Sequence, residues 1–218
     1  MSKSSLEGLL EKLKERTEES VSNVRQMEAV NGSGKLARHY YYCPQCLTVE
    51  VFFRSYLYRM KRKGKKPECF RCKVEMKPID EHFKAEYEKT AWAFYEKAKS
   101  VLERAWPIMD SWWRGVKGYM ADTGLVEVYF DAYSYLSLRR EGRGVKARLY
   151  LHYLENEKLE DLLKLISILR EEGQVKGEVQ VDGRQDHCEV PEEKMRSHGF
   201  IRTGELGKIP HDDFYLEL

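Results

Sequence analysis

The stretch Cys43-Pro44-Gln45-Cys46 is followed, after 22 intervening residues, by Cys69-Phe70-Arg71-Cys72. A four-thiolate metal site requires this spacing, because each Cys-x-x-Cys pair forms a tight turn that aims two thiolates at one point. These pairs contain four of the five cysteines in the chain. Paired in this way, the cysteines indicate metal binding in a reducing compartment rather than disulfides. We expect the segment between the pairs to form a hairpin that brings them together.

The module around these cysteines, about residues 38–79, resembles the zinc-ribbon fold. The resemblance implies that zinc is held by Cys43, Cys46, Cys69 and Cys72. Iron in a rubredoxin-like site is the main alternative, since the same four thiolates suit it. Because the protein supplies all four ligands, we expect the site to stabilise the fold and assign it no chemistry.

Positive charge is concentrated in the same part of the chain. Residues 35–79 contain 12 basic and three acidic residues, a net charge of +9, whereas the whole chain has a net charge of +2. Clustered lysine and arginine residues neutralise phosphates, so this segment predicts binding to nucleic acid. We expect the nucleic acid to be DNA rather than RNA. An acidic protein surface is the alternative partner. The predicted nucleic-acid-binding residues are Arg54, Arg59, Lys61, Arg62, Lys63, Lys65, Lys66 and Arg71.

Composition excludes several other classes. The chain has 218 residues, 42% of them hydrophobic, which is enough to bury a core and too balanced in charge for a disordered polyelectrolyte. No stretch approaches the ~20 apolar residues of a membrane span, and the first 14 residues lack the apolar core of a signal peptide. We therefore expect a cytoplasmic protein without membrane contact. Five glutamines and three asparagines among many charged residues are typical of thermophilic proteins.

Hydrophobic periodicity predicts an α+β protein. A helix is expected over residues 4–30, and a second from residue 80 that Pro107 interrupts before a short helix ending at Met120. A long strand over residues 126–138 and a strand over 145–153 should form a hairpin. The expected domains are an N-terminal helix and linker (1–34), the zinc ribbon (35–79), a tryptophan-rich helical connector (80–123) and an α/β domain (124–218).

The last of these segments resembles the second half of the GNAT superfamily of N-acetyltransferases. The resemblance rests on EKMRSHGFIRTGE at residues 193–205, similar to that family's closing helix, Gly-Phe and strand, and on the final strand DFYLEL at 213–218. It implies a GNAT-like mixed α/β domain with the order β-β-α-β-α-β-β. Met195 stands where the family often has a general-acid tyrosine, and a methionine cannot donate a proton.

An acetyl-CoA site is the alternative reading of this domain. Its candidate residues are Arg139, Gly142 and Gly144, which match the family's pyrophosphate-binding pattern. In the family this pattern opens a helix whose free amides hold the phosphates. Here residues 145–154 alternate with period two, so we expect the pattern to join two strands. If residues 145–154 were helical, the pattern would be placed as in the family.

We therefore expect a non-enzymatic protein whose C-terminal domain serves interaction or homodimerisation. An N-acetyltransferase is the first alternative. The second is an assembly factor that uses the N-terminal helix and the tryptophan cluster as interfaces. The adjacent residues Asp186-His187-Cys188 suggest a nucleophile pair only weakly, because neighbouring side chains usually point apart.

Overall fold

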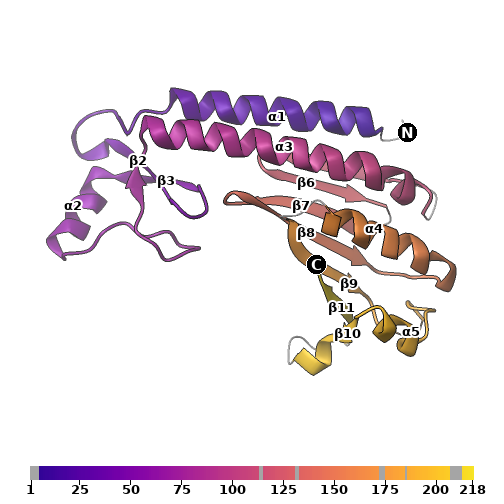
Figure 1. The fold of residues 1–218 in the computed structure, drawn as a ribbon. Helices are drawn as coiled ribbons and strands as arrows, with labels where there is room; N and C mark the ends of the chain where they lie inside the picture. The colour runs from indigo at the N-terminus through magenta and orange to yellow at the C-terminus, as the bar shows by residue number, and fades with distance from the viewer. Residues whose placement is uncertain (1–4, 113–114, 131–132, 172–174, 185, 207–212) are drawn as a thin grey trace. The chain divides into compact units, whose positions relative to one another are not determined.

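The structure is a computed structural model that describes residues 5–112, 115–130, 133–171, 175–184, 186–206 and 213–218 (Figure 1). The chain forms two compact units. Unit 1 comprises residues 1–16, 94–140 and 144–218, and unit 2 comprises residues 17–93 and 141–143. The helices α1 (Leu6–Gln26) and α3 (Glu81–Asp110) contribute residues to both units. The chain contains long helices and two separate sheets, which confirms the predicted α+β class.

Unit 2 contains a small antiparallel sheet built around β2 (Arg38–Tyr42). This strand pairs along its whole length with β3 (Val49–Phe53). The short strands β1 (Val30–Asn31) and β4 (Lys77–Pro78) pair with opposite ends of β2. The predicted helix over residues 4–30 is therefore too long, because α1 stops at Gln26 and the chain then enters this sheet.

The second half of α1 and the first half of α3 hold this sheet in place. Val21 and Val24 of α1 and Phe83 of α3 are at most 5% exposed and share one hydrophobic cluster with Tyr42. The rings of Tyr42 and Phe83 stack with centroids 4.3 Å apart. Burial of such side chains contributes about 1.5–3 kcal/mol each. The end of β2, where the first cysteine pair begins, is thus anchored to the helices.

Unit 1 is built on a seven-stranded sheet with the order β10-β11-β9-β8-β7-β6-β5. Its strands are β5 (Gly118–Asp122), β6 (Leu125–Tyr129), β7 (Tyr135–Glu141), β8 (Gly144–Leu151), β9 (Val175–Val181), β10 (Ile201–Arg202) and β11 (Phe214–Glu217). β8 and β9 are parallel, and α4 (Leu159–Glu171) crosses from one to the other. The short helix α5 (Glu192–Ser197) precedes β10.

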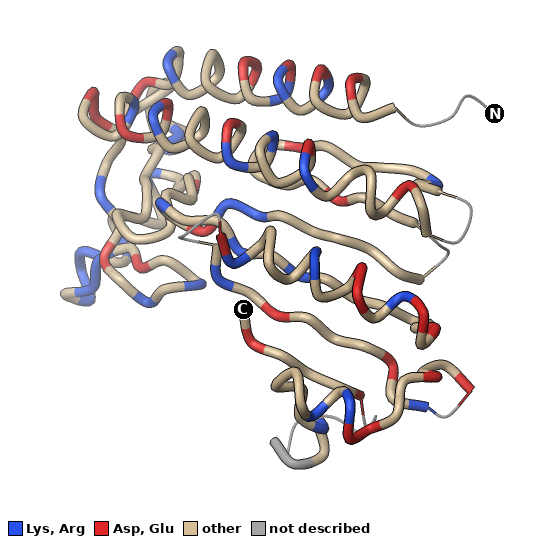
Figure 2. The backbone as a smooth tube through the Cα atoms, turned by 45° about the vertical axis from the view of Figure 1, so that its right-hand side comes forward, with Lys and Arg blue, Asp and Glu red and all other residues tan. Residues whose placement is uncertain are grey.

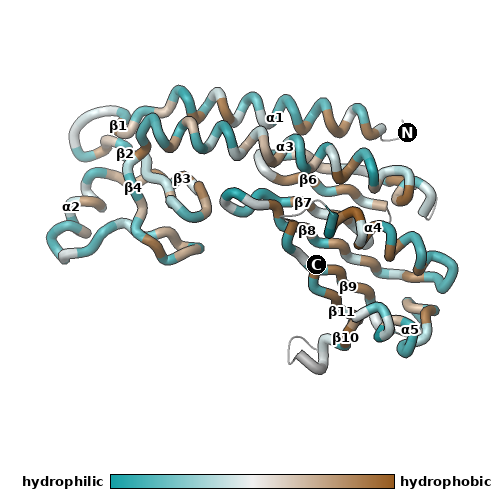
Figure 3. Tube along the Cα trace, in the orientation of Figure 1, coloured by the Kyte–Doolittle hydropathy of each residue, from teal (hydrophilic) through white to brown (hydrophobic). Residues whose placement is uncertain are grey.

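Alternating burial defines the core of unit 1. Along β8, every second residue from Val145 to Leu151 is at most 5% exposed, as a half-buried strand requires. Leu162, Leu165 and Leu169 of α4 are at most 2% exposed. The same elements carry the apolar segments visible in Figure 3. Among the described residues, no helix is both long and apolar enough to cross a membrane.

The predicted helix break at Pro107 is wrong, and so is the predicted short helix ending at Met120. α3 continues to Asp110 with the proline in its last turns. A proline inside a helix removes one backbone hydrogen bond, and the burial of side chains such as Met109, which is 0% exposed, outweighs that loss. Met120 then lies in β5 rather than in a helix.

The predicted long strand over residues 126–138 is two strands. β6 and β7 pair antiparallel, with Val126 opposite Leu138, and the Phe130 amide donates to the Ser134 carbonyl oxygen where the chain reverses. The apolar residues on both strands face the same core, so the period-two pattern concealed the reversal. From residue 124 the order is β-β-β-α-β-α-β-β, one strand more than predicted.

Candidate metal centre and basic surface

The two Cys-x-x-Cys segments fold into matching turns. In each turn, the amide of the first cysteine, Cys43 or Cys69, donates to the carbonyl oxygen five residues ahead. The carbonyl oxygen of the same cysteine accepts from the amide four residues ahead, and all four distances are 2.9 Å. Each turn ends on a residue with a φ of 58°, Leu47 in the first and Lys73 in the second. The chain therefore builds the same ligand-presenting turn twice.

These turns bring four sulfur atoms together. The Sγ atoms of Cys46 and Cys69 are 3.6 Å apart, and the Sγ atoms of all four cysteines lie within 4.8 Å of one another. A tetrahedron with zinc–sulfur bonds of about 2.3 Å has edges of about 3.8 Å. Cys43 and Cys69 are fully buried, whereas Cys46 and Cys72 are half-buried. The residues predicted as ligands thus form one cluster that can hold a metal ion.

The surroundings of the cluster control the charge on its thiols. Burial raises the pKa of Cys43. Burial also raises the pKa of Cys46, but its hydrogen bonds with the Thr48 hydroxyl and amide and with neighbouring thiols outweigh burial and lower this pKa to about 7. Hydrogen bonding to Cys46, followed by desolvation, raises the pKa of Cys72 to about 12. Four thiolates this close require a cation to offset their charge, so metal binding should release protons.

The left-handed backbone at Lys73 gives a first testable prediction. This conformation costs a non-glycine residue about 1–2 kcal/mol, and the Lys73 side chain is exposed. The greater flexibility of an unfolded glycine offsets part of that strain. We expect Lys73→Gly to raise the free energy of unfolding by up to about 1 kcal/mol in urea titrations of the metal-loaded protein. Lys77→Gly, in β4 without a positive φ, should lower it instead.

The segment between the two turns is not the predicted hairpin. β3 leads directly into α2 (Arg54–Arg62), because this stretch lacks β-branched residues and is rich in helix-forming arginine, lysine, leucine and methionine. Gly64, with a φ of 63°, ends the helix. The Lys65 amide donates to the Met60 carbonyl oxygen and the Gly64 amide to that of Lys61, each at 3.0 Å, which is a Schellman motif.

Seven of the predicted phosphate-binding residues lie on this helix or in the turn after it, and Arg71 lies in the second cysteine turn. Figure 2 shows the lysine and arginine positions of the chain in blue. All eight are exposed. Lys66 forms an ion pair with Glu75 at 2.9 Å, and the Arg71 guanidinium lies 5.2 Å from the centroid of the Phe70 ring. In the described part of the chain, no carboxylate pairs with the other six, which are Arg54, Arg59, Lys61, Arg62, Lys63 and Lys65. Their charge therefore faces solvent without compensation.

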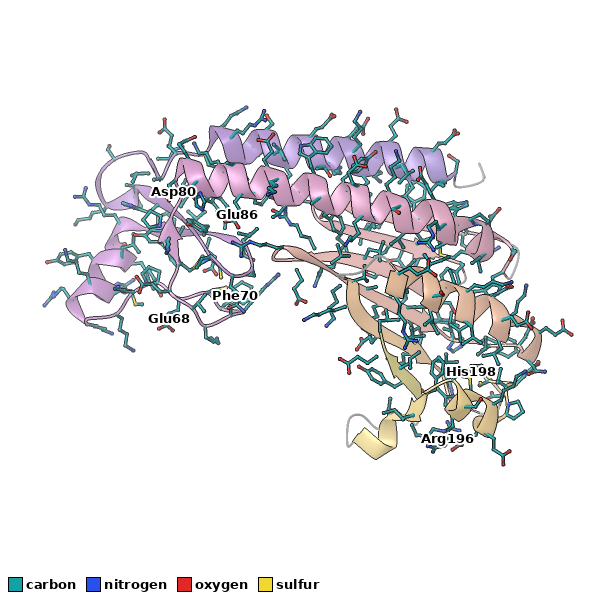
Figure 4. All side chains as sticks on the ribbon, viewed as in Figure 1. Glu68, Phe70, Asp80, Glu86, Arg196 and His198 are labelled. Carbon is teal, nitrogen blue, oxygen red and sulfur yellow. The ribbon has the colours of Figure 1, made fainter. Side chains whose placement is uncertain are left out.

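Aromatic side chains and a hollow lie among these charges. Tyr58 on α2 is 63% exposed, and Phe70 in the second cysteine turn, labelled in Figure 4, is 59% exposed. A hollow of about 540 Å³ opens between α2 and the short helix at Gly34–Leu36. It is lined by Gly34, Lys35, Arg54, Ser55, Tyr58 and Arg59. The hollow combines an aromatic wall with three cationic side chains.

The residues of the alternative acetyl-CoA site do not open a helix. Arg139 lies in β7, Gly142 in the turn after it and Gly144 at the start of β8. The alternation predicted for residues 145–154 is thus confirmed from Val145 to Leu151. A side chain at Gly142 would place its Cβ 2.6 Å from the Gln45 carbonyl oxygen, so this turn packs against protein backbone. The pattern therefore does not stand at a helix N-terminus, where the family's free amides hold the pyrophosphate.

Sequence analysis missed one cluster of polar residues. His152, Asp182 and His187 bring three metal-ligating atoms within 4.8 Å of one another. His187 turns toward Asp182, whereas the Cys188 thiol donates to the Val190 carbonyl oxygen, so the suggested nucleophile pair is not formed. The sequence feature that could have indicated this cluster is the position of His152 and Asp182, each of which directly follows a strand.

We compared the chain with protein-family models, curated proteins and solved structures. No protein-family model matches it, and neither a curated protein nor a solved structure matches it.

Proposed function

We propose that this protein binds zinc through its four clustered cysteines and binds nucleic acid through α2 and the turn that follows. The observation that carries the proposal is the set of six exposed cationic side chains on α2 and the turn after it, none of which pairs with a carboxylate among the described residues. Two of them, Arg54 and Arg59, also line the hollow beside Tyr58. We propose zinc because the module resembles a zinc ribbon, and iron held by the same four thiolates is the alternative. An iron-loaded protein would be coloured, so absorption and elemental analysis of the purified protein distinguish the two metals.

The charge distribution supports a phosphate ligand. Cationic side chains that face solvent attract a polyanion and release its counterions on binding, whereas charges already paired in the protein contribute little. The metal cluster fixes both ends of the segment that carries them, since Cys46 precedes β3 and Cys69 follows the turn after α2. Pre-ordering the segment lowers the entropy that binding would otherwise lose.

The exposed aromatic residues favour single strands over duplexes. Bases in single strands can stack on tyrosine and phenylalanine, whereas paired bases cannot leave the helix without a cost. Tyr58 borders the hollow, where an unpaired base would lie between its ring and the Arg54 and Arg59 guanidinium groups. Duplex binding would use the same charges but not this hollow.

Fluorescence anisotropy of the zinc-loaded protein tests the proposal. Short single strands and duplexes of DNA and of RNA are titrated at 50 mM and 200 mM salt. We expect single strands to bind more tightly than duplexes, and affinity to fall steeply with salt. The DNA and RNA arms decide which polymer is preferred. Absence of binding to every oligonucleotide at low salt would refute the nucleic-acid proposal and leave the metal site as it is.

Replacing the aromatic wall of the hollow provides a separate prediction. We expect Tyr58→Ala to weaken single-strand binding by about 1–3 kcal/mol, since one stacked base contributes that much. Duplex affinity and the salt dependence should change little, because no charge is removed. Tyr133→Ala is a matched control, since Tyr133 in unit 1 is 64% exposed and lies outside α2. Equal losses for single strands and duplexes would contradict a stacking role.

For unit 1 we propose a GNAT-like scaffold without acetyl-transfer residues. The order α5, Gly199-Phe200, β10 and a final strand β11 agrees with the resemblance in the sequence. Met195, fully buried, takes the position of the expected tyrosine, and the glycine pattern lies in a β-turn. We propose interaction or dimerisation as its role. A rise in melting temperature on addition of acetyl-CoA would instead favour the acetyltransferase.

A further inference from the structure

Three side chains that commonly bind metals meet at one edge of the sheet in unit 1. β8 and β9 are parallel, with Leu151 opposite Val181, so both strands end at the same edge. His152 follows β8 directly, and Asp182 follows β9 directly. Ligands of open α/β sheets bind outside the carboxyl ends of parallel strands, because side chains there are not needed for the core.

The loop after β9 brings the second histidine to the same place. The Leu154 amide donates to the His187 carbonyl oxygen at 2.8 Å, and the Glu189 amide donates to the Leu154 carbonyl oxygen at 3.0 Å. Backbone hydrogen bonds thus fix the position of His187 beside the continuation of β8. The His152 amide donates to the hydroxyl of the buried Ser134 at 2.9 Å, which fixes the first histidine in the same way.

The geometry of the three side chains is close to that of a coordination site. The Nδ1 atoms of His152 and His187 lie 3.4 and 2.9 Å from the same oxygen, Oδ2 of Asp182. Tetrahedral ligands about 2.0–2.1 Å from a zinc ion are separated by about 3.3 Å. The Asp182 side chain is 7% exposed, and the His187 and His152 side chains are 18% and 27% exposed. The cluster is thus shielded on the protein side and reachable from solvent through the histidines.

The donor set selects the class of ion. Two imidazoles and one carboxylate suit zinc, ferrous iron and neighbouring transition metals, whereas magnesium and calcium prefer oxygen ligands throughout. The Asp186 carboxylate lies 3.6 Å from Nε2 of His187, on the opposite side of the ring from Asp182. This distance is too long for a hydrogen bond and the Asp186 side chain is 80% exposed, so Asp186 adds negative charge near the cluster without fixing the ring of His187.

We propose that His152, Asp182 and His187 form a second metal site, which binds a divalent transition-metal ion. Three protein ligands leave at least one coordination position open, unlike the closed four-cysteine cluster. The open position would take a water molecule or a small ligand atom. The proposal depends neither on the cysteine cluster nor on nucleic-acid binding, because all three residues belong to unit 1.

Arg184 competes with the ion for the carboxylate. Its Nη2 lies 2.6 Å from Oδ2 of Asp182 and its Nε 3.0 Å from Oδ1. The arginine side chain is 58% exposed, so it has room to swing away. Arg184→Gln removes this cation and its side-chain hydrogen bonds, whereas the backbone amide of residue 184 still donates to Oδ1 at 3.2 Å. We expect the substitution to raise metal affinity by about tenfold. In a cluster that served only as an ion-pair network, the same substitution would create no metal binding.

The test uses the full chain with its cysteine cluster already loaded with zinc, to which Co²⁺ is added. We expect one further equivalent to bind, with weak ligand-field absorption and without the intense sulfur-to-cobalt charge-transfer band of a thiolate site. His187→Asn should weaken this binding by at least about 100-fold, since even an outer partner contributes 10–100-fold. His198→Asn is the matched control, because His198 is an exposed histidine at the end of α5, outside the cluster (Figure 4).

Two results would overturn the second site. One is the absence of a further equivalent in both the unaltered protein and Arg184→Gln. The other is unchanged cobalt binding in His187→Asn and in His152→Asn, the second of which leaves the loop after β9 intact. Circular dichroism of each variant shows whether unit 1 has kept its fold, so a folded variant that loses the cobalt equivalent supports the site.

Discussion

Cys69→Ala is expected to abolish metal binding and to unfold the segment between the two cysteine turns. The cysteine is 0% exposed and packs in one hydrophobic cluster with Met76, Tyr41 and Phe52. Binding of a structural zinc ion contributes about 10–16 kcal/mol in small zinc modules, which exceeds the net stability of most domains. Elemental analysis measures the metal, and near-ultraviolet circular dichroism reports the packing of Tyr41 against Phe52, whose rings are 5.5 Å apart.

Cys188→Ala is the control for this substitution. Cys188 is half-buried, lies in unit 1 and belongs to neither turn. We expect the Cys188 variant to retain its full metal content and the aromatic signal of unit 2. If Cys69→Ala kept both, the four-thiolate assignment would be wrong.

Neutralising four charges at the end of α2 is expected to weaken nucleic-acid binding strongly. The variant replaces Lys61, Arg62, Lys63 and Lys65 with glutamine. Among the described residues, none of these four cationic side chains pairs with a carboxylate. Each lost phosphate contact lowers the slope of log affinity against log salt by about 0.7 for single strands. Four lost contacts lower it by about 3, so affinity at low salt should fall by on the order of 100-fold or more.

A variant of equal net charge separates local contacts from overall electrostatics. Lys12, Lys146, Lys164 and Lys176 are exposed lysines of unit 1, and their replacement with glutamine also changes the net charge from +2 to −2. We expect this second variant to bind nearly as tightly as the unaltered protein. Equal weakening in the two variants would show that the protein attracts nucleic acid only through its total charge.

The metal cluster was predictable because its determinants are local. The spacing within each Cys-x-x-Cys pair sets the turn, and the distance between pairs permits their approach, so neither depends on the rest of the fold. The period-two pattern of residues 145–151 identified β8 for the same reason.

The errors arose where tertiary contacts override a local signal, or where a local signal was not used. Pro107 is a helix breaker by itself, yet α3 continues because its last turns are buried. We predicted a hairpin between the cysteine pairs only because the two pairs must come together. The residues at 54–62 have high helix propensity, and they form α2. The cluster of His152, Asp182 and His187 could not be seen, because Asp182 is 30 residues from His152 and the parallel register alone brings them together.

The two matching cysteine turns, joined by 22 residues, have a kinetic consequence. Each turn is closed by its own short-range hydrogen bonds, so either one can hold an ion with two thiolates before the other arrives. The connecting chain keeps the second pair at an effective concentration on the order of millimolar. An ion released by one turn is therefore recaptured far more often than it escapes. A chelator can remove the ion only while a single turn holds it. Because that state is short-lived, metal exchange should be slow even when the bound ion is in equilibrium with solvent.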